Sequence, residues 1–180
     1  MKRVFGLAIF LAATSLICAQ LSLAQQTKDP VTTVLRDALA GRQKNTVAAF
    51  EAMPADKYDY KPTPDQMTFG HLAAHIVEAN DFFCSNAGNI PAPKHDDFKG
   101  TEGKDKLVAA VKSSFEFCGT ALDKASDSTL GDSIKGFDGK PKLRSWAFMG
   151  LASSWADHYG TAAMYLRLNN ILPPTAQPKK

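Results

Sequence analysis

The sequence lacks a large excess of charge of either sign. It holds 21 basic and 18 acidic residues, and two of the basic ones, Lys2 and Arg3, lie in an acid-free stretch of 24 residues at the start. The rest of the chain therefore carries 19 basic against 18 acidic residues. Such a balance excludes the electrostatic footprint of a nucleic-acid-binding protein. With 44% hydrophobic and 22% charged residues, the 180-residue chain has the composition of one globular domain.

Hydrophobic runs long enough to span a bilayer are missing after the first 24 residues. The N-terminal segment has a basic start, "MKR", then the short apolar run "VFGLAIFLAATSLICA" and the small residues of "SLA". This pattern predicts a secretory signal peptide over residues 1–24, cleaved after Ala24. An uncleaved membrane anchor is the alternative, but the apolar run is short and its exit is polar. We expect a periplasmic or secreted protein with no membrane association after cleavage.

Cysteine is scarce, with three residues in the chain. Signal cleavage would leave Cys84 and Cys118, and an even pair in an oxidising compartment suggests one disulfide. The alternative is two separate buried thiols that pack as small hydrophobes. The chain contains no C-x-x-C motif, so a thiol redox role is disfavoured against a structural one.

Strand-like alternation is also missing, whereas four segments show helical periodicity. We expect helices over Asp29–Met53, from a Thr68 cap to "NAGN", over Thr101–Lys124 and over Leu143–Asn170. The segment "ASDSTLGDSIKGFDGKPK" is expected to be a loop with two glycine turns. Together these features predict an all-α four-helix bundle over residues 25–172, followed by a disordered tail at 173–180. The apolar stripe of the first helix is expected to contain Val31, Val34, Leu35, Ala38, Leu39, Val47 and Phe50.

The linker between the second and third helices sets the order of the bundle. Its length of about 14 residues reaches roughly 45 Å when extended, longer than a helix of about 30 Å. A crossover is therefore allowed, and the second and third helices can run parallel. Cys84 and Cys118 lie toward the C-terminal ends of these helices, so only a parallel arrangement brings them within disulfide distance.

Histidines on two helices are the candidate site residues. His71 and His75 are one turn apart, and His75 and His158 each lie on an apolar stripe. Core-facing histidines can converge in a bundle interior and bind a divalent metal such as Zn, Ni, Mn or Fe. Alternatively, each imidazole packs and hydrogen-bonds locally without any metal. The neighbours at helical spacing are Leu72, Ile76 and Ala79 around His75, and Leu151, Trp155, Ala162 and Tyr165 around His158.

Three segments, "YDYKPTPDQMTFGHLAAHI", "EANDFFCSNAG" and "DHYGTAAMYLRLNNILPP", together resemble the DinB-like (DinB/YfiT) superfamily. The resemblance covers nearly the whole chain after the predicted signal peptide. It implies a four-helix bundle in up-down-down-up order. It also implies, for many members, a divalent metal held by three histidines, and for some a thiol-dependent transferase or isomerase activity.

The family ligands map only in part onto this chain. The histidine of the second helix matches His75, and the second histidine of the fourth-helix pair matches His158 in "HYG". The first of that pair falls on Ser154, which is a poor ligand for these metals. His71 is the candidate replacement, and Glu78 is a candidate hydrogen-bond acceptor for the His75 ring. His95, in the loop segment "PAPKHDDFKG", is assigned no role.

Two functions follow from these observations. The first is an exported metal-dependent enzyme, hydrolase-like or transferase-like, whose divalent ion is held by His75, His158 and His71. The alternative is a metal-free bundle with a degenerate site, which binds a small molecule or a partner in its cleft. The sequence names no substrate and no exposed apolar stripe demands a dimer, although the resemblance makes a homodimer an expectation to test.

Overall fold

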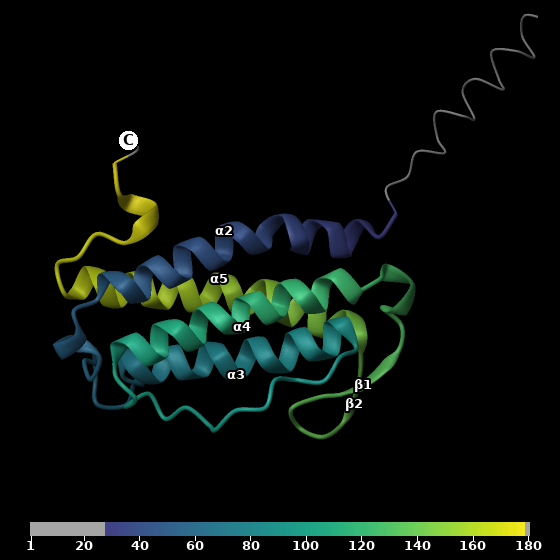
Figure 1. Ribbon diagram of the computed structural model, residues 1–180, viewed down its shortest axis with the longest axis horizontal. Helices are drawn as coiled ribbons and strands as arrows, with labels where there is room; N and C mark the ends of the chain where they lie inside the picture. The colour runs from purple at the N-terminus through teal and green to yellow at the C-terminus, as the bar shows by residue number, and fades with distance from the viewer. Residues whose placement is uncertain (1–27, 179–180) are drawn as a thin grey trace, which may run out of the picture. The chain divides into compact units, whose positions relative to one another are not determined.

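Four long helices make up most of residues 28–178, the part of the chain that this computed structural model describes (Figure 1). The four predicted helices are confirmed, with ends that differ by a few residues. Within the described residues no helix is both long and apolar enough to cross a membrane. The predicted signal peptide lies outside this part. The helices are α2 (Pro30–Ala52), α3 (Phe69–Gly88), α4 (Lys104–Lys124) and α5 (Arg144–Leu168).

Local side-chain chemistry fixes the two ends of α3. The Thr68 side chain accepts a hydrogen bond from the backbone N–H of His71 at 3.1 Å, and this satisfies one of the free donors of the first turn. At the other end, Asn89 adopts the left-handed conformation with φ 52°, and its backbone N–H donates to the carbonyl of Ser85. Asparagine tolerates this conformation better than most residues, so it stops the helix. Both ends agree with the sequence prediction.

Helices α3 and α4 run parallel. The Asn80 side chain donates to the Ser114 hydroxyl at 2.9 Å, and Cys84 forms a disulfide with Cys118. Both pairs have the same sequence separation of 34 residues, so position advances along the two helices in the same direction. The disulfide expected from a parallel arrangement is therefore present.

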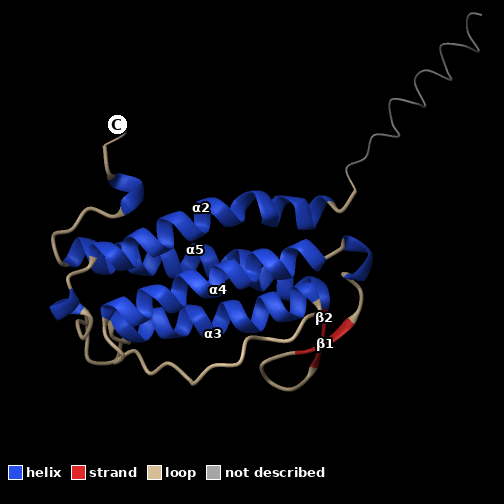
Figure 2. Ribbon diagram, in the orientation of Figure 1, coloured by secondary structure: helices blue, strands red, loops and turns tan. Residues whose placement is uncertain are grey.

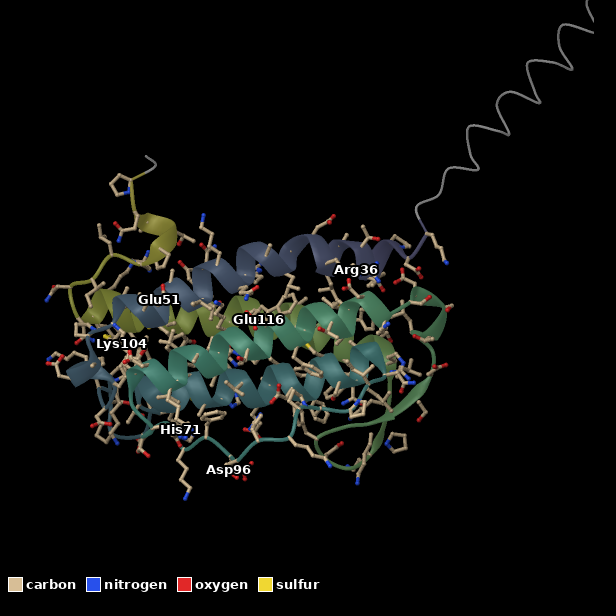
Figure 3. All side chains as sticks on the ribbon, viewed as in Figure 1. Arg36, Glu51, His71, Asp96, Lys104 and Glu116 are labelled. Carbon is tan, nitrogen blue, oxygen red and sulfur yellow. A yellow bond between two sulfur atoms is a disulfide. The ribbon has the colours of Figure 1, made fainter. Side chains whose placement is uncertain are left out.

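Helices α5 and α2 run in the opposite direction. On α5, Trp155 donates to Asn80 of α3 at 2.9 Å, and Tyr165 packs against Phe69 near the start of α3 with ring centroids 6.0 Å apart. At the end of α2, the carbonyl of Glu51 accepts from Lys104 at the start of α4 at 2.6 Å (Figure 3). The order is therefore up-down-down-up, as predicted.

The crossover loop, residues 89–103, connects α3 to α4 and runs along the bundle (Figure 1). It lies against the start of α3, where glycines allow two backbones to approach. A Cβ on Gly100 would lie 2.4 Å from the backbone nitrogen of His71, and Gly100 also has a φ of +83°. Only glycine fits such a position, so the loop is held against the first turn of α3.

A short β-hairpin precedes α5, where the sequence predicted only a loop (Figure 2). Strands β1 (Ser133–Lys135) and β2 (Pro141–Leu143) pair antiparallel, with Ser133 opposite Leu143. The predicted glycine turns join them, and Gly139 has a φ of +74°. Strands of three residues are too short to show an alternating pattern, so this prediction was wrong for a physical reason.

The first turn of α2 also differs from the prediction. Val31 and Val34 are 42% and 67% exposed and do not belong to the core, whereas Leu35 and Phe50 are buried. Thr32 takes the inward position instead. Its N–H and hydroxyl donate to one carboxylate oxygen of Asp127, at 2.9 and 2.7 Å, so its polar atoms are satisfied.

Three short 3-10 helices complete the described chain. η1 (Ala55–Lys57) follows α2, η2 (Asp127–Thr129) follows α4, and η3 (Pro174–Ala176) follows α5. The last of these lies in the segment predicted as a disordered tail. Within it, Thr175 accepts a hydrogen bond from the hydroxyl of Tyr159 at 2.8 Å, which ties the segment to α5.

Candidate functional site

His75 of α3 and His158 of α5 meet inside the bundle. Their rings contact edge to face, with centroids 4.9 Å apart and an interplanar angle of 72°. Both residues are half-buried. The antiparallel packing of α3 and α5 produces this contact, because each histidine lies on the stripe that faces the other helix. The two family-matched histidines thus converge, as their positions on apolar stripes predicted.

Ser154 lies beside this pair. Its hydroxyl oxygen is 3.1 Å from Nδ1 of His158, one turn along α5. Which atom donates depends on the tautomer of His158. The serine therefore stands where the family pattern has a third histidine, and it hydrogen-bonds to the second.

The His158 imidazole is neutral at neutral pH. Burial, and to a lesser extent the neighbouring His75 ring, lower its pKa from 6.5 to about 4, against a smaller opposing effect of Asp157. A neutral imidazole can accept a hydrogen bond at one nitrogen and donate at the other. The pair and Ser154 thus form a polar site without a fixed positive charge on His158.

His71 does not complete a metal centre with this pair. It is exposed, near the start of α3 on the side of the crossover loop (Figure 3). Glu78 is exposed too, and no hydrogen bond joins it to His75. Across residues 28–178, no three His, Cys, Asp or Glu side chains are placed to hold one metal ion. Two imidazoles and a hydroxyl do not fit the three-histidine set that the family resemblance implies.

Three hollows meet at His75, and each is named here for its lining. The crossover cleft, of about 410 Å³, is lined by His71, Ala74, His75, Val77, Glu78, Asp81, Pro93, His95, Asp97 and Phe98. The aromatic cleft, of about 350 Å³, is lined by His75, Ala79, Phe83, Phe137, Gly150, Ser153, Ser154, Asp157 and His158. The tyrosine cleft, of about 320 Å³, is lined by Asp65, Gln66, Met67, Leu72, His75, Asp157, His158, Thr161 and Tyr165.

A cluster of aromatic rings forms the apolar wall of the aromatic cleft. Phe137, in the hairpin turn, stacks on Phe82 with centroids 3.7 Å apart and meets Phe83 edge to face at 5.2 Å. Trp146 packs against the Phe137 ring, with the two ring centroids 5.9 Å apart. Sequence reasoning missed Phe137 as a site residue, and its only signal was a phenylalanine within the glycine turn "GFDG".

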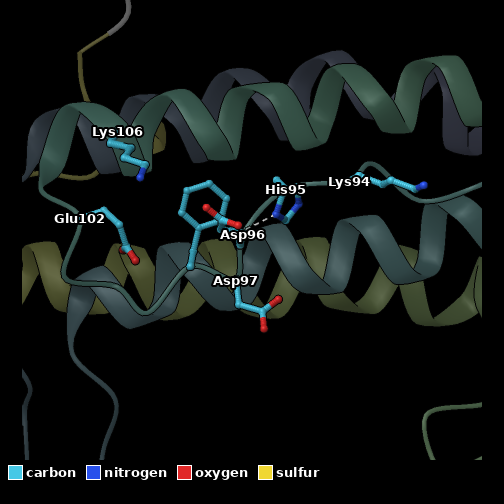
Figure 4. A pocket seen from close by; sticks show the side chains of 7 residues that line it. Lys94, His95, Asp96, Asp97, Glu102 and Lys106 are labelled. Carbon is cyan, nitrogen blue, oxygen red and sulfur yellow. Dashed lines mark hydrogen bonds between the residues drawn. The ribbon is translucent and has the colours of Figure 1, made fainter.

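The crossover loop is attached to α3 through His95, which the sequence left without a role. Nε2 of His95 lies 2.7 Å from a carboxylate oxygen of Asp81. Nδ1 of the same ring lies 2.9 Å from the carbonyl of Asp96 (Figure 4). The hydrogen bond to Asp81 raises the pKa of His95. Burial raises the pKa of Asp81, and His95 offsets only part of that rise. In the sequence, the only indication of this role was the run "HDD", in which two aspartates follow His95.

A larger hollow lies between the crossover loop and the start of α4 (Figure 4). It has a volume of about 610 Å³ and contains neither His75 nor His158. Mostly exposed, charged loop side chains line it, so we place the candidate site at the histidine pair instead. Its lining is Lys94, His95, Asp96, Asp97, Phe98, Glu102 and Lys106.

Three solved structures share the fold of this chain. The chain is similar to the structure of a DinB-like protein of Bacillus subtilis, with 18% identity and a TM-score of 0.62, covering 81% of this chain and 99% of that one. A DinB-like protein of Bacillus cereus matches with 16% identity and a TM-score of 0.61, over 77% of this chain and 92% of that one. A conserved protein of Enterococcus faecalis matches with 16% identity and a TM-score of 0.62, over 79% and 98%.

At these identities the solved structures establish the fold alone. The comparison with curated proteins found no match. The profile of the DinB superfamily matches residues 38–162, which is more than half of the sequence and includes His75, Ser154 and His158. The chain therefore belongs to the DinB superfamily.

Proposed function

We propose that this protein is a DinB-superfamily bundle that binds an organic small molecule at the His75–His158 pair without a metal ion. The observation that carries the proposal is the hydrogen bond between Ser154 and Nδ1 of His158. It replaces a metal ligand with a hydroxyl that is bonded to the neighbouring imidazole. Chemistry that needs a Lewis acid is therefore not assigned to this site.

The surroundings of the pair support ligand binding. The aromatic and tyrosine clefts both contain His75, Asp157 and His158, so the pair lies where two hollows meet. Ligand sites are typically concave and largely apolar, with a few convergent polar groups. Here the polar groups are the two imidazoles and the Ser154 hydroxyl, and the apolar part is the wall of Phe83 and Phe137.

Export to the periplasm remains part of the proposal and rests on the N-terminal sequence pattern. An exported location fits a binding role for a small molecule, because the site needs no cytosolic thiol. Mass spectrometry of the protein after expression in a bacterial host would show the predicted mature N-terminus at residue 25.

Calorimetric titration of residues 25–180 with Zn²⁺, Ni²⁺ and Mn²⁺ tests the metal-free assignment. We expect no one-to-one metal binding tighter than the micromolar range, either in the wild type or in the His71→Ala variant. Tight binding that is lost in His158→Ala would overturn the proposal. Loss in His71→Ala as well would show a site rebuilt around His71 and would support the metal-dependent enzyme.

A further inference from the structure

Acidic side chains outnumber basic ones around the histidine pair, where His95, paired with Asp81 in the crossover cleft, is the one group that can offset them. Carboxylates line the three clefts that contain His75, and among residues 28–178 no Lys or Arg side chain lines any of them. This differs from the whole chain, which has 21 basic residues and a net charge of +3. The carboxylates are Asp65, Glu78, Asp81, Asp97 and Asp157.

Asp157 holds the central place among these carboxylates. It lines both the aromatic and the tyrosine cleft, next to His158 on α5. Its charge acts on the imidazole of the adjacent residue His158. Within residues 28–178, Asp157 takes part in no ion pair with a basic side chain. The carboxylate is therefore available to a cation that enters either cleft.

The opposite wall of the aromatic cleft is built from packed rings. Phe137 is 59% exposed, yet contacts with Phe82, Phe83 and Trp146 hold it in place. Gly150 of α5 allows Phe83 to lie directly against the helix, because a Cβ there would come within 2.3 Å of the Phe83 ring. Aromatic faces attract flat apolar groups and also cations.

The hydrogen-bonding capacity of the site also favours a cation over an anion. The groups that face the junction of the two clefts are imidazoles, a hydroxyl and a carboxylate, all of which can accept a hydrogen bond. An ammonium group is a donor without acceptor capacity. An anion would meet acceptors and a like charge at Asp157, with no guanidinium or ammonium to receive it.

We infer that the ligand is an organic amine that carries an aromatic group, with its ammonium at Asp157 and the His75–His158 pair and its ring against Phe83 and Phe137. This inference rests on the proposed function, because it names the ligand class of the same metal-free site. No covalent step is involved.

Three compounds with one phenyl ring and different charge test the inference: 2-phenylethylamine, 2-phenylethanol and 3-phenylpropionate. Each is titrated at pH 7 into ¹⁵N-labelled residues 25–180. The chain has two tryptophans. Trp146 packs on Phe137, whereas Trp155 is buried with its indole N–H on Asn80 and lines none of the three clefts. The Trp146 indole signal therefore reports the site, and the Trp155 signal serves as the internal control.

We expect the amine to bind at least about fivefold more tightly than the alcohol, and the carboxylate to bind most weakly. Asp157→Asn should remove the preference for the amine and leave the alcohol unchanged. Asp37→Asn, which changes an exposed carboxylate on α2, is the matched control and should have no effect. Phe137→Ser should weaken the amine and the alcohol alike, without unfolding the protein, because Phe137 lies in an exposed turn.

Two results would overturn the inference. One is equal or tighter binding of the carboxylate, and the other is an amine preference that survives Asp157→Asn. A Zn²⁺ titration of the same samples distinguishes rejection of the ligand class from rejection of the proposed function. Absence of metal binding together with no amine preference would reject the ligand class alone, whereas tight Zn²⁺ binding lost in His158→Ala would reject the metal-free site itself.

Discussion

The rings of His75 and His158 meet edge to face with their centroids 4.9 Å apart, although the two residues come from antiparallel helices 83 positions apart in the sequence. Two imidazoles this close cannot both be charged without repulsion. Burial and this neighbour together keep His158 neutral. The pair is therefore a hydrogen-bonding site at neutral pH, and this property has consequences that can be measured.

Stability should fall on acidification because of His158. Its pKa is 6.5 ordinarily and about 4 in the folded protein, so between these values the unfolded chain binds more protons than the folded one. The free energy of unfolding therefore decreases as pH falls from 6.5 toward 4. Urea unfolding of the wild type and of His158→Gln at pH 7 and pH 4.5 measures the effect. The wild type should lose more stability than the variant, and parallel losses would contradict this account.

His95 should affect stability in the opposite direction, so that its contribution decreases as pH rises. Its pKa is raised in the folded protein, chiefly by the hydrogen bond to Asp81, so its contribution is fully present below pH 6.5 and is lost as pH rises through the folded value. Hydrogen exchange of the crossover loop at pH 6 and pH 9 tests this. Because amide exchange is itself base-catalysed, the readout is the protection factor, which is the intrinsic rate at that pH divided by the observed rate. The protection factors of the loop should be lower at pH 9 than at pH 6 in the wild type, and low at both pH values in His95→Gln. A loop that exchanges equally in both proteins would show that the contact does not hold it.

The disulfide between Cys84 and Cys118 should contribute about 2–4 kcal/mol to the free energy of unfolding, because it closes a loop of moderate length. Urea unfolding with and without a reducing agent measures the contribution. The double variant Cys84→Ala/Cys118→Ala is the control, and its stability should not respond to the reductant. A wild type that is equally insensitive would indicate that the bridge adds nothing to stability.

Asn80 connects three helices and should be costly to remove. It is 1% exposed, accepts from the indole N–H of Trp155 and donates to the Ser114 hydroxyl, both at 2.9 Å. Asn80→Ala leaves a buried indole donor without a partner, at a cost of about 2–4 kcal/mol. Asn86→Ala is the matched control, because that side chain bonds only within its own helix. Equal losses in the two variants, measured by urea unfolding, would argue against the network.

The helices and their order were predictable because their signals are local or geometric. Leu107, Val111, Phe115 and Leu122 follow helical spacing in the sequence, and all four are buried. Thr68 and Asn89 mark the ends of α3 by their own chemistry. The length of the linker allowed the crossover, and a disulfide between the two cysteines was feasible only with parallel helices. Such features depend on neighbours in the sequence or on chain length.

The site was predictable only in part, because it depends on contacts between distant segments. The positions of His75 and His158 on apolar stripes indicated their convergence. His71 was expected to join them, but helix geometry turns it toward the crossover loop. The ion pair of Asp81 with His95 and the stacking of Phe137 on Phe82 arise only when a loop and a hairpin fold back. No periodic pattern encodes such contacts.

Restoration of the missing family ligand is the most direct test of the central claim. Ser154→His places a third imidazole one turn before His158, where the Ser154 hydroxyl is now 3.1 Å from Nδ1. Met164→His, also on α5, is the matched control, because that residue is 58% exposed and lines none of the three clefts. Calorimetry with Zn²⁺ on the wild type and both variants is the measurement.

We expect Ser154→His to bind one Zn²⁺ at least about 100-fold more tightly than the wild type and the control, since a three-histidine set is then complete. A wild type that already binds Zn²⁺ at nanomolar concentration, or a Ser154→His variant that gains nothing, would contradict this expectation.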